Sequence, residues 1–130
     1  ASCLVGSEMC IRDRMNIKEI GDELRKVSRE CRDLKINKKE FFGGSMTISS
    51  LGGIGGTFFT PIINPPEVAI LGVGRSYDKL VKIKGQLINR KILPISLSYD
   101  HRIIDGAEGA RFCVHLNKSL GKDFAFKLAV

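Results

Sequence analysis

The chain has no tryptophan and only two tyrosines among its 130 residues, so aromatic side chains on which nucleic-acid bases could stack are scarce. Its net charge of +7 does suggest an affinity for anions, yet acidic residues are mixed with the basic ones. Residues 18–40, for example, hold eight basic and six acidic side chains. We interpret this pattern as a solvated surface or a modest attraction to an anionic cofactor, and we expect no nucleic-acid partner.

The chain also lacks any apolar run of the roughly 20 residues that a membrane-spanning helix needs, so no membrane association is expected. Its four cysteines, Cys3, Cys10, Cys31 and Cys113, form no C-x-x-C motif and no cluster with the spacing of a zinc site. The sequence therefore predicts free thiols in a reducing compartment and no bound metal.

Residues 1–14, "ASCLVGSEMCIRDR", stand apart from the rest of the chain. They have no positively charged region ahead of an adequate apolar stretch, so they do not form a secretory signal. They resemble the translated read-through of a sequencing adapter. We interpret residues 1–14 as a non-native leader or sequencing artefact, and residues 15–130 as the domain.

The remaining apolar residues predict an α/β layer with helices packed on a sheet. From Ile17 to Leu34 they recur every three or four residues, which indicates a helix lying on a sheet. "SMTISS" and "EVAILGVG" are typical of strands, the second of them buried. Residues 80–100 are expected to form two strands joined by a turn near Asn89 and Arg90. Residues 106–120 predict a largely buried helix.

His101, one of only two histidines, lies between Asp100 and Asp105 where the last strand meets the last helix. One interpretation is structural: Asp105 caps the helix, with Glu108 three residues later, and His101 is a polar turn residue. The other is chemical, because a neutral imidazole is a natural general base near neutral pH. Spacing alone leaves both open.

Ser49 and Ser50 precede the glycines at positions 52, 53, 55 and 56, which lack the pattern of a phosphate-binding loop. The glycines predict a tight turn with close backbone approach. The serines are either plain strand-end residues or hydrogen-bond donors to a developing oxyanion.

Two stretches together carry a family resemblance. "DHRIIDGAEGARF" resembles the DHRxxDG signature of the dihydrolipoamide acyltransferases, the E2 cores of 2-oxo acid dehydrogenase complexes. "GGSMTISSLGGIGGTFFTPIINPPEVAILGVG" resembles a second segment of that family, in the right order along the chain. The resemblance covers roughly residues 17–130, the C-terminal half of the catalytic domain. "TPIINPPEVAILGVG" and "ILPISLSYDHR" look most like the bacterial branch that transfers acetyl groups from pyruvate.

The resemblance implies a partial domain with a chloramphenicol-acetyltransferase-like two-layer sandwich, helices on a mixed sheet. It implies that His101 is the base that deprotonates a thiol. Ser49 matches the serine that hydrogen-bonds the tetrahedral oxyanion, with Ser50 as the alternative if the register differs by one. Asp105 matches the signature aspartate, which orients the loop, and Gly106 lets the helix start close to neighbouring backbone.

The substrates implied are coenzyme A and a dihydrolipoyl group carried on a domain absent here, with most coenzyme A contacts expected in the missing N-terminal half. The partners implied are two further copies in a trimer, a larger core built from trimers, and the E1 and E3 subunits. His101 and Ser49 are expected from different chains of the trimer, and the apolar residues 41–74 at its interface. The location implied is the bacterial cytoplasm, or the mitochondrial matrix in a eukaryote.

Two alternatives to acetyl transfer remain from the sequence. One is a non-catalytic scaffold subunit, which has no need of His101. The other is an enzyme for succinyl or branched-chain acyl groups. A drug-modifying acetyltransferase on the same fold is disfavoured, because the residue before His101 is Asp100 rather than a second histidine.

Overall fold

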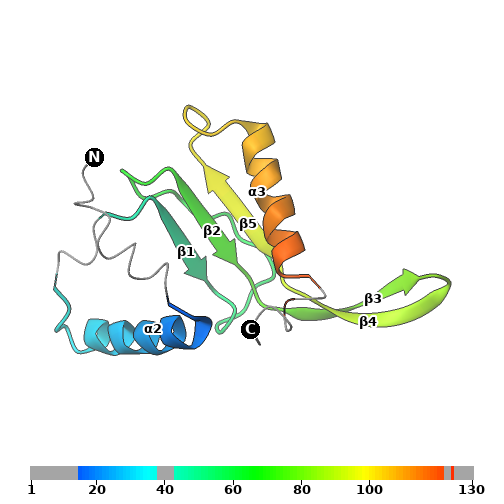
Figure 1. The fold of residues 1–130 in the computed structure, drawn as a ribbon, viewed down its shortest axis with the longest axis horizontal. Coiled ribbons are helices and arrows are strands. Elements are labelled where there is room, and N and C mark those ends of the chain that lie inside the picture. The colour runs from blue at the N-terminus through cyan, green and yellow to red at the C-terminus, as the bar shows by residue number, and fades with distance from the viewer. Residues whose placement is uncertain (1–14, 38–42, 122–123, 125–130) are drawn as a thin grey trace. The chain divides into compact units, whose positions relative to one another are not determined.

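The computed structural model describes residues 15–37, 43–121 and 124. The chain divides into two compact units, one of residues 1–43 with 124–130 and the other of residues 44–123. Helix α2 (Ile17–Arg32) belongs to the first unit, and strands β1 to β5 and helix α3 belong to the second. Figure 1 shows these elements along the chain.

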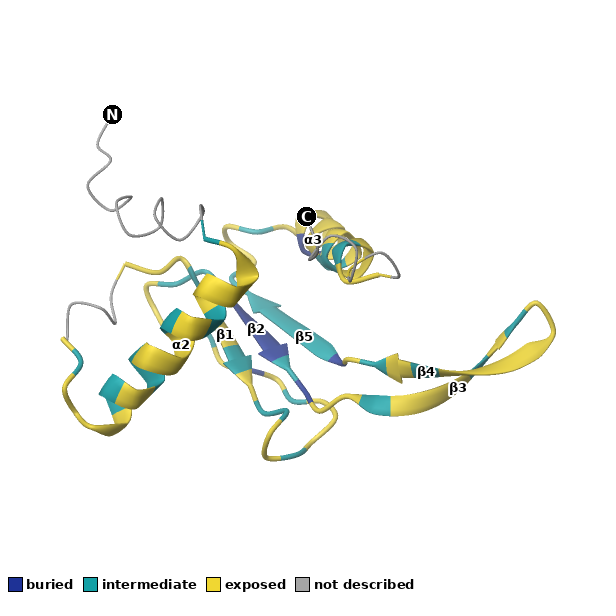
Figure 2. Ribbon diagram, turned by 60° about the horizontal axis from the view of Figure 1, so that its bottom comes forward, coloured by how far each residue is buried: buried dark blue, intermediate teal, exposed yellow. Residues whose placement is uncertain are grey.

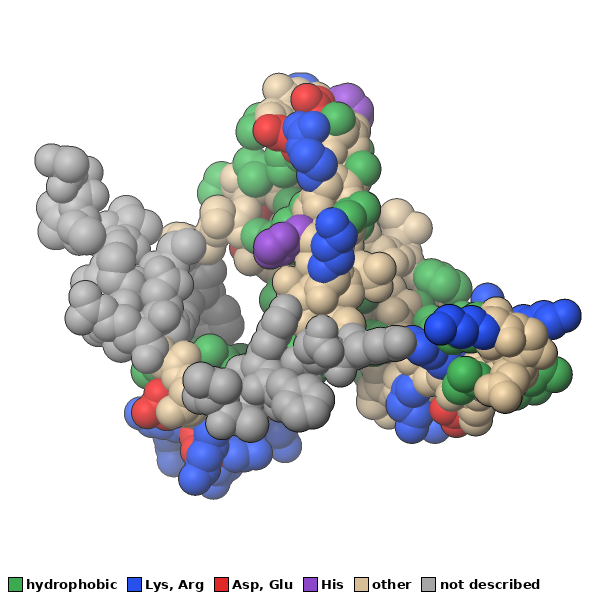
Figure 3. Space-filling view, turned by 45° about the vertical axis from the view of Figure 1, so that its right-hand side comes forward, with side chains coloured by type: hydrophobic (Ala, Val, Ile, Leu, Met, Phe, Trp, Pro, Cys, Tyr) green, Lys and Arg blue, Asp and Glu red, His purple; other side chains and the backbone are tan. Residues whose placement is uncertain are grey.

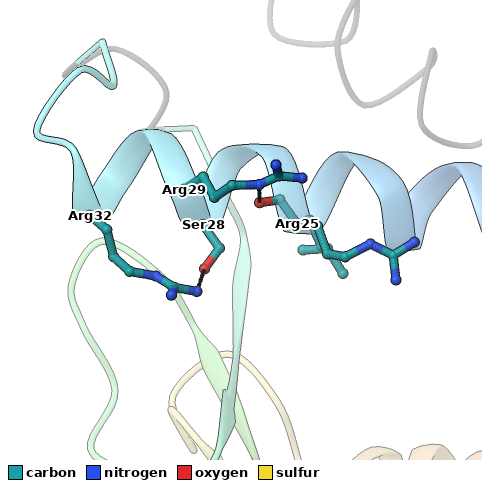
Figure 4. Close-up of a pocket in the computed structure, with 5 residues that line it drawn as sticks. Arg25, Ser28, Arg29 and Arg32 are labelled. Atoms are coloured by element: carbon teal, nitrogen blue, oxygen red, sulfur yellow. Dashed lines mark hydrogen bonds between the residues drawn. The ribbon is translucent and has the colours of Figure 1, made fainter.

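Helix α2 begins at a complete capping box. The Asn16 side chain accepts a hydrogen bond from the Glu19 backbone N–H, and the Glu19 carboxylate accepts one from the Asn16 N–H. Arginines follow on the exposed surface, where Arg29 donates to the Arg25 carbonyl and Arg32 to the Ser28 hydroxyl (Figure 4). The helix predicted from Ile17 is confirmed, and its packing on a sheet stays a prediction.

The second unit is built on a three-stranded mixed sheet in the order β1-β2-β5. Strand β1 (Met46–Ser50) runs parallel to β2 (Ala69–Val73), and β2 runs antiparallel to β5 (Ile95–Tyr99). The central strand β2 holds the core residues Ala69, Ile70 and Leu71, each at most 7% exposed, and Figure 2 shows it as the buried strand of the sheet. The buried strand predicted from "EVAILGVG" is confirmed.

One strand was missed from the sequence. The prediction of two strands in residues 80–100 with a turn near Asn89 is wrong. The chain instead forms a hairpin of β3 (Tyr77–Ile83) and β4 (Gln86–Ile92), then β5. The hairpin turns at Lys84 and Gly85, both at positive φ, as a two-residue turn between twisted strands requires. Pro94, which has no backbone N–H to donate, lies between β4 and β5.

The hairpin β3–β4 leaves basic and apolar side chains exposed together, as Figure 3 shows at its right-hand side. Leu80 and Leu87 are 67% and 70% exposed. A two-stranded hairpin with so few buried side chains has little stability of its own in water.

Helix α3 (Gly106–Ser119) packs on β5 through Gly109. A Cβ at Gly109 would lie 2.9 Å from Cε1 of Tyr99, so only glycine lets the helix approach this ring. The prediction that α3 is largely buried is wrong. Only Gly109 is buried in this helix, and Val114 is 52% exposed, because β5 covers one narrow strip of it.

The glycine-rich segment after β1 forms the predicted tight turn. The N–H groups of Ile54 and Gly55 both donate to the Leu51 carbonyl, and Gly55 and Gly56 have positive φ. A Cβ at Gly52 would lie 3.3 Å from the Gly74 carbonyl oxygen, which shows the close backbone approach that the glycines indicated.

Gly74, at the end of β2, leaves no room for a side chain. A Cβ there would lie 2.3 Å from the Thr57 carbonyl oxygen and 3.0 Å from Pro94. We expect Gly74→Ala to lower the free energy of unfolding by roughly 1–3 kcal/mol, measured by urea denaturation. The control is Gly53→Ala, where no atom lies within 4 Å and the expected change is below about 0.5 kcal/mol. Equal midpoints for the two variants contradict the packing described here.

Candidate active site

His101 opens a tight turn that hydrogen bonds fix at both ends. The Asp100 N–H donates to the Val68 carbonyl at 2.8 Å, which ties the start of the turn to the chain just before β2. The Asp100 carbonyl accepts from the N–H groups of Ile103 and Ile104, both at 3.0 Å. The backbone on either side of His101 is therefore held in one place.

Asp100 and Arg102, which flank His101, pair with each other. Arg102 donates to the Asp100 carboxylate through its Nε, at 3.0 and 3.1 Å, and through a terminal nitrogen at 2.6 Å. The Arg102 backbone N–H donates to the same carboxylate at 3.0 Å. The pair spans His101 and leaves its imidazole unengaged by either neighbour. The sequence patterns predicted no pairing between these two residues, although opposite charges on both sides of a candidate base were a signal for one.

This pairing sets the acidity of Asp100. Hydrogen bonds from the Arg102 guanidinium and backbone lower the pKa of the Asp100 carboxyl from 3.8 to about 2. Because the folded pKa is depressed, the stabilising contribution is fully present above pH about 4 and is lost as the pH falls through about 2. Between pH 5 and 9 the pair is constant, and no change in activity in that window arises from Asp100.

We expect Arg102→Leu to raise the pKa of Asp100 toward its ordinary value, because the hydrogen bonds and the positive charge disappear. The measurement is a carbon-13 NMR titration of the Asp100 carboxyl. Arg111→Leu, on the exposed surface of α3, serves as the control and leaves the titration unchanged. An unchanged Asp100 titration in Arg102→Leu contradicts the pairing.

The His101 imidazole lies between Tyr99 and the start of α3. The His101 and Tyr99 ring centroids are 5.7 Å apart, with the planes inclined by 41°. A Cβ at Gly106 would lie 3.9 Å from Nε2 of His101, an ordinary van der Waals distance, so the helix begins beside the ring. The predicted close approach of Gly106 to neighbouring backbone stays a prediction. His101 is exposed, and it lines an open cleft of about 490 Å³ formed by residues 63, 65–68 and 99–103. The imidazole is therefore accessible from the cleft.

Asp105 is the N-cap of α3. Its backbone is extended (φ −81°, ψ 164°), and its carboxylate accepts a hydrogen bond from the Glu108 N–H at 2.7 Å. This geometry satisfies one of the free N–H groups of the first helical turn. With its carboxylate used in this way, Asp105 fixes the end of the loop that contains His101.

Ser49 lies in β1 beside Gly72 of β2, which in turn lies beside Ser96 of β5. Because side chains alternate along a strand, Ser49 and Ser50 point to opposite faces of the sheet. Ser50 pairs with Val73, and Val73 pairs with Ile95, so these three side chains lie on one face of the sheet. Tyr99 is four residues after Ile95 on β5 and therefore lies on the same face, where it contacts α3. Ser49 therefore faces away from α3.

Ser49 and His101 do not meet within one chain. Ser49 is in register with Ser96 of β5, and Tyr99 is three residues farther along that strand. β1 and β5 are also separated by β2. At ordinary strand dimensions the Cα atoms of Ser49 and Tyr99 are roughly 14 Å apart, and His101 lies beyond the end of β5. Two predicted site residues, His101 and Asp105, are thus brought to one turn, and the third is placed elsewhere.

Other candidate groups in the described part of the chain give no second site. Among the described residues, no three His, Cys, Asp or Glu side chains gather as a metal site would require. Cys31 and Cys113 are free thiols, and Cys3 and Cys10 lie outside the described residues. Within residues 15–37, 43–121 and 124, no helix has the length and apolar character of a membrane span.

Residues 44–121 thus combine a three-stranded mixed sheet, a helix that packs on β5 and an exposed histidine on a turn held by hydrogen bonds. The model of the family "2-oxoacid dehydrogenases acyltransferase (catalytic domain)" matches residues 10–125. The chain belongs to this family, as its two sequence motifs indicated.

Comparison with known proteins agrees at the level of sequence and fold. The chain is 50% identical over 108 residues to the dihydrolipoyllysine-residue acetyltransferase component of the pyruvate dehydrogenase complex of Cupriavidus necator. The aligned residues make up 83% of this chain and 20% of that protein. It superposes on the Azotobacter vinelandii dihydrolipoamide acetyltransferase with a TM-score of 0.80 at 44% identity. In that enzyme a serine, a histidine and an asparagine have roles in the catalytic mechanism.

A further solved structure, the cubic core of a pyruvate dehydrogenase multienzyme complex, matches with a TM-score of 0.81 at 43% identity. Each of these two matches covers 87% of this chain and 46% of the other. The chain therefore spans about a fifth of the curated relative's length and just under half of each solved chain. The chloramphenicol-acetyltransferase-like fold, as a partial domain, is confirmed.

Proposed function

We propose that this chain is the C-terminal half of an acetyltransferase catalytic domain that moves an acetyl group between dihydrolipoamide and coenzyme A. One observation carries the proposal. In the Azotobacter enzyme the catalytic serine and histidine are 52 residues apart, and the asparagine follows four residues after the histidine. Ser49, His101 and Asp105 have the same two separations. The spacing supports Ser49 over Ser50.

Asp105 stands where the Azotobacter enzyme has asparagine. Aspartate and asparagine are about equally good N-cap residues, because each offers a side-chain oxygen to the first helical turn. A residue that transferred protons could not be exchanged in this way. The difference therefore supports a role for Asp105 in orienting the loop.

The proposed mechanism follows from these placements. His101 takes the proton from the thiol of one substrate, and the resulting thiolate attacks the carbonyl carbon of the other substrate's acetyl thioester. The Ser49 hydroxyl donates a hydrogen bond to the oxyanion of the tetrahedral intermediate. When the intermediate collapses, the original carbon–sulfur bond breaks and the leaving thiolate takes the proton back from His101. Coenzyme A and the dihydrolipoyl group are both substrates, and no metal takes part.

The separation of Ser49 and His101 within one chain supports a site shared between subunits of a trimer. Ile54 and Ile62 are 88% and 87% exposed, and Phe58 is 66% exposed, all within the segment expected at the trimer interface. A protein chain seldom leaves so much apolar surface in water. We propose that trimers build a larger core, as the cubic core of a related chain suggests. We also propose that this core binds E1 and E3 in the bacterial cytoplasm.

The domain boundaries remain a proposal. Residues 1–14 lie outside the described residues, and the family match begins at residue 10. We retain residues 15–130 as the native part of the domain.

An acyl-exchange assay tests the proposed function. The intact gene product containing this chain is given dihydrolipoamide with acetyl-, succinyl- or isobutyryl-coenzyme A, and thioester formation is followed. The proposal predicts transfer with the acetyl donor strongly preferred. Preference for another donor reassigns the substrate, and absence of transfer in a correctly assembled core favours a scaffold subunit.

A further inference from the structure

Glu67 is the single charged residue among residues 41–74, and the mechanism above gives it no role. It is half-buried, and its carboxylate accepts a hydrogen bond from the Thr47 hydroxyl at 2.5 Å. Thr47 is also half-buried and lies near the start of β1. The bond therefore links β1 to the segment that leads into β2, at the end of the sheet where the His101 turn lies.

A series of hydrogen bonds continues from this bond to the His101 turn. Val68, next to Glu67, donates its N–H to the Ser45 carbonyl at 3.3 Å, and its own carbonyl accepts the Asp100 N–H at 2.8 Å. The Asp100 carbonyl then holds the far side of the turn. The position of Glu67 and Val68 thus sets the position of Asp100, the residue before His101.

The same segment forms a wall of the His101 cleft. Glu67 and Val68 line the cleft together with Tyr99, Asp100 and His101. A shift of residues 67–68 would therefore move His101 relative to the surface against which a substrate thiol lies. Misplacement of a reacting group by about 1 Å is enough to cost on the order of 10²-fold in rate.

We propose that Thr47 and Glu67 form a positioning pair for His101. Their hydrogen bond fixes residues 67–68, and these fix the turn through the Asp100 N–H. Neither residue has a role in the chemical steps proposed above. The inference rests on the proposed function for its catalytic consequence, and its structural part is testable without activity.

The first test is hydrogen exchange of the Asp100 backbone amide in this chain. Thr47→Val removes the hydroxyl and keeps the shape, so the Asp100 amide is expected to exchange about tenfold faster. Thr47→Ser keeps the hydroxyl, and Thr60→Val removes an exposed one elsewhere in the segment, so both are expected to match the parent chain. The amide of Leu71, in the centre of β2, is the internal reference. Unchanged exchange at Asp100 in Thr47→Val overturns the proposal.

The second test is kinetic and uses the intact gene product. A positioning role predicts that Thr47→Val, which leaves the cleft lining unchanged, lowers kcat about tenfold or more, with KM and Tm almost unchanged. Glu67→Leu is expected to lower kcat by a similar factor, and its KM is not used because Glu67 lines the cleft. Glu67→Gln, which keeps an acceptor oxygen, is expected to restore most of the rate. A kcat equal to the parent's overturns the proposal. A loss of activity that accompanies a lowered Tm, and disappears when the rate is divided by the amount of folded protein, also overturns it.

His101→Ala, run alongside, separates the two ideas. If it retains full activity, the proposed function of His101 fails while the exchange experiment still decides whether the pair holds the turn. If it is inactive and Thr47→Val is as active as the parent, only the positioning pair fails.

Discussion

His101→Ala is expected to lower kcat for acetyl transfer by about 10²–10⁴-fold, the range over which a positioned general base contributes. The expectation follows from the exposed imidazole on the cleft and from the absence of another histidine in the turn. KM should change little, because the cleft walls formed by residues 63 and 65–68 remain. Stopped assays of the intact gene product at saturating substrate measure the effect.

The matched control is His115→Ala, which removes the chain's other histidine from an exposed position on α3. This variant is expected to have parent activity. Light scattering should show both variants assembled as the parent is, because His101 is exposed and supports no core packing. Parent turnover in His101→Ala rejects its assignment as the base and favours the polar-turn interpretation.

Ser49→Ala is expected to lower kcat by about 10²–10³-fold, which is the typical loss of one oxyanion donor and a smaller loss than for His101→Ala. The serine contributes only when negative charge develops on the carbonyl oxygen, so kcat and kcat/KM should fall together. The same saturating assay and a substrate titration measure this.

Ser50→Ala provides the control because the strand places Ser50 on the opposite face, toward α3. It removes the same hydroxyl one residue away and is expected to retain activity. If Ser50→Ala is impaired and Ser49→Ala is normal, the register of the oxyanion donor is wrong by one residue and the spacing argument fails.

The sequence could predict elements that have a regular pattern of apolar residues. It could not predict the position of the hairpin turn or how far α3 is buried. Helix α2 and strand β2 follow directly from periodicity and from an uninterrupted apolar run. Only one glycine marks the hairpin turn at Lys84 and Gly85 in the sequence. The turn was therefore predicted at Asn89 and Arg90, five residues too late. The burial of α3 was overestimated because amphipathic spacing shows which residues can be buried and cannot show whether a partner is present.

The candidate site divides in the same way. Motif spacing named His101, Ser49 and Asp105, and the helix cap at Asp105 was readable from Glu108 three residues later. The Asp100–Arg102 pair was not predicted, although the opposite charges on either side of His101 were a signal for it. The distance between Ser49 and His101 needed the strand order, since β5 returns antiparallel beside β2 and places His101 at the opposite end of the sheet from Ser49.

The most direct test of a site shared between subunits is to mix two inactive variants. His101→Ala and Ser49→Ala subunits are coexpressed in equal amounts, and acetyl transfer is measured on the purified assembly. If one subunit supplies His101 and its neighbour supplies Ser49, random mixing makes about a quarter of the sites complete. The account predicts activity near a quarter of the parent's. Activity no higher than that of either variant alone, in assemblies shown by mass spectrometry to contain both subunits, contradicts it.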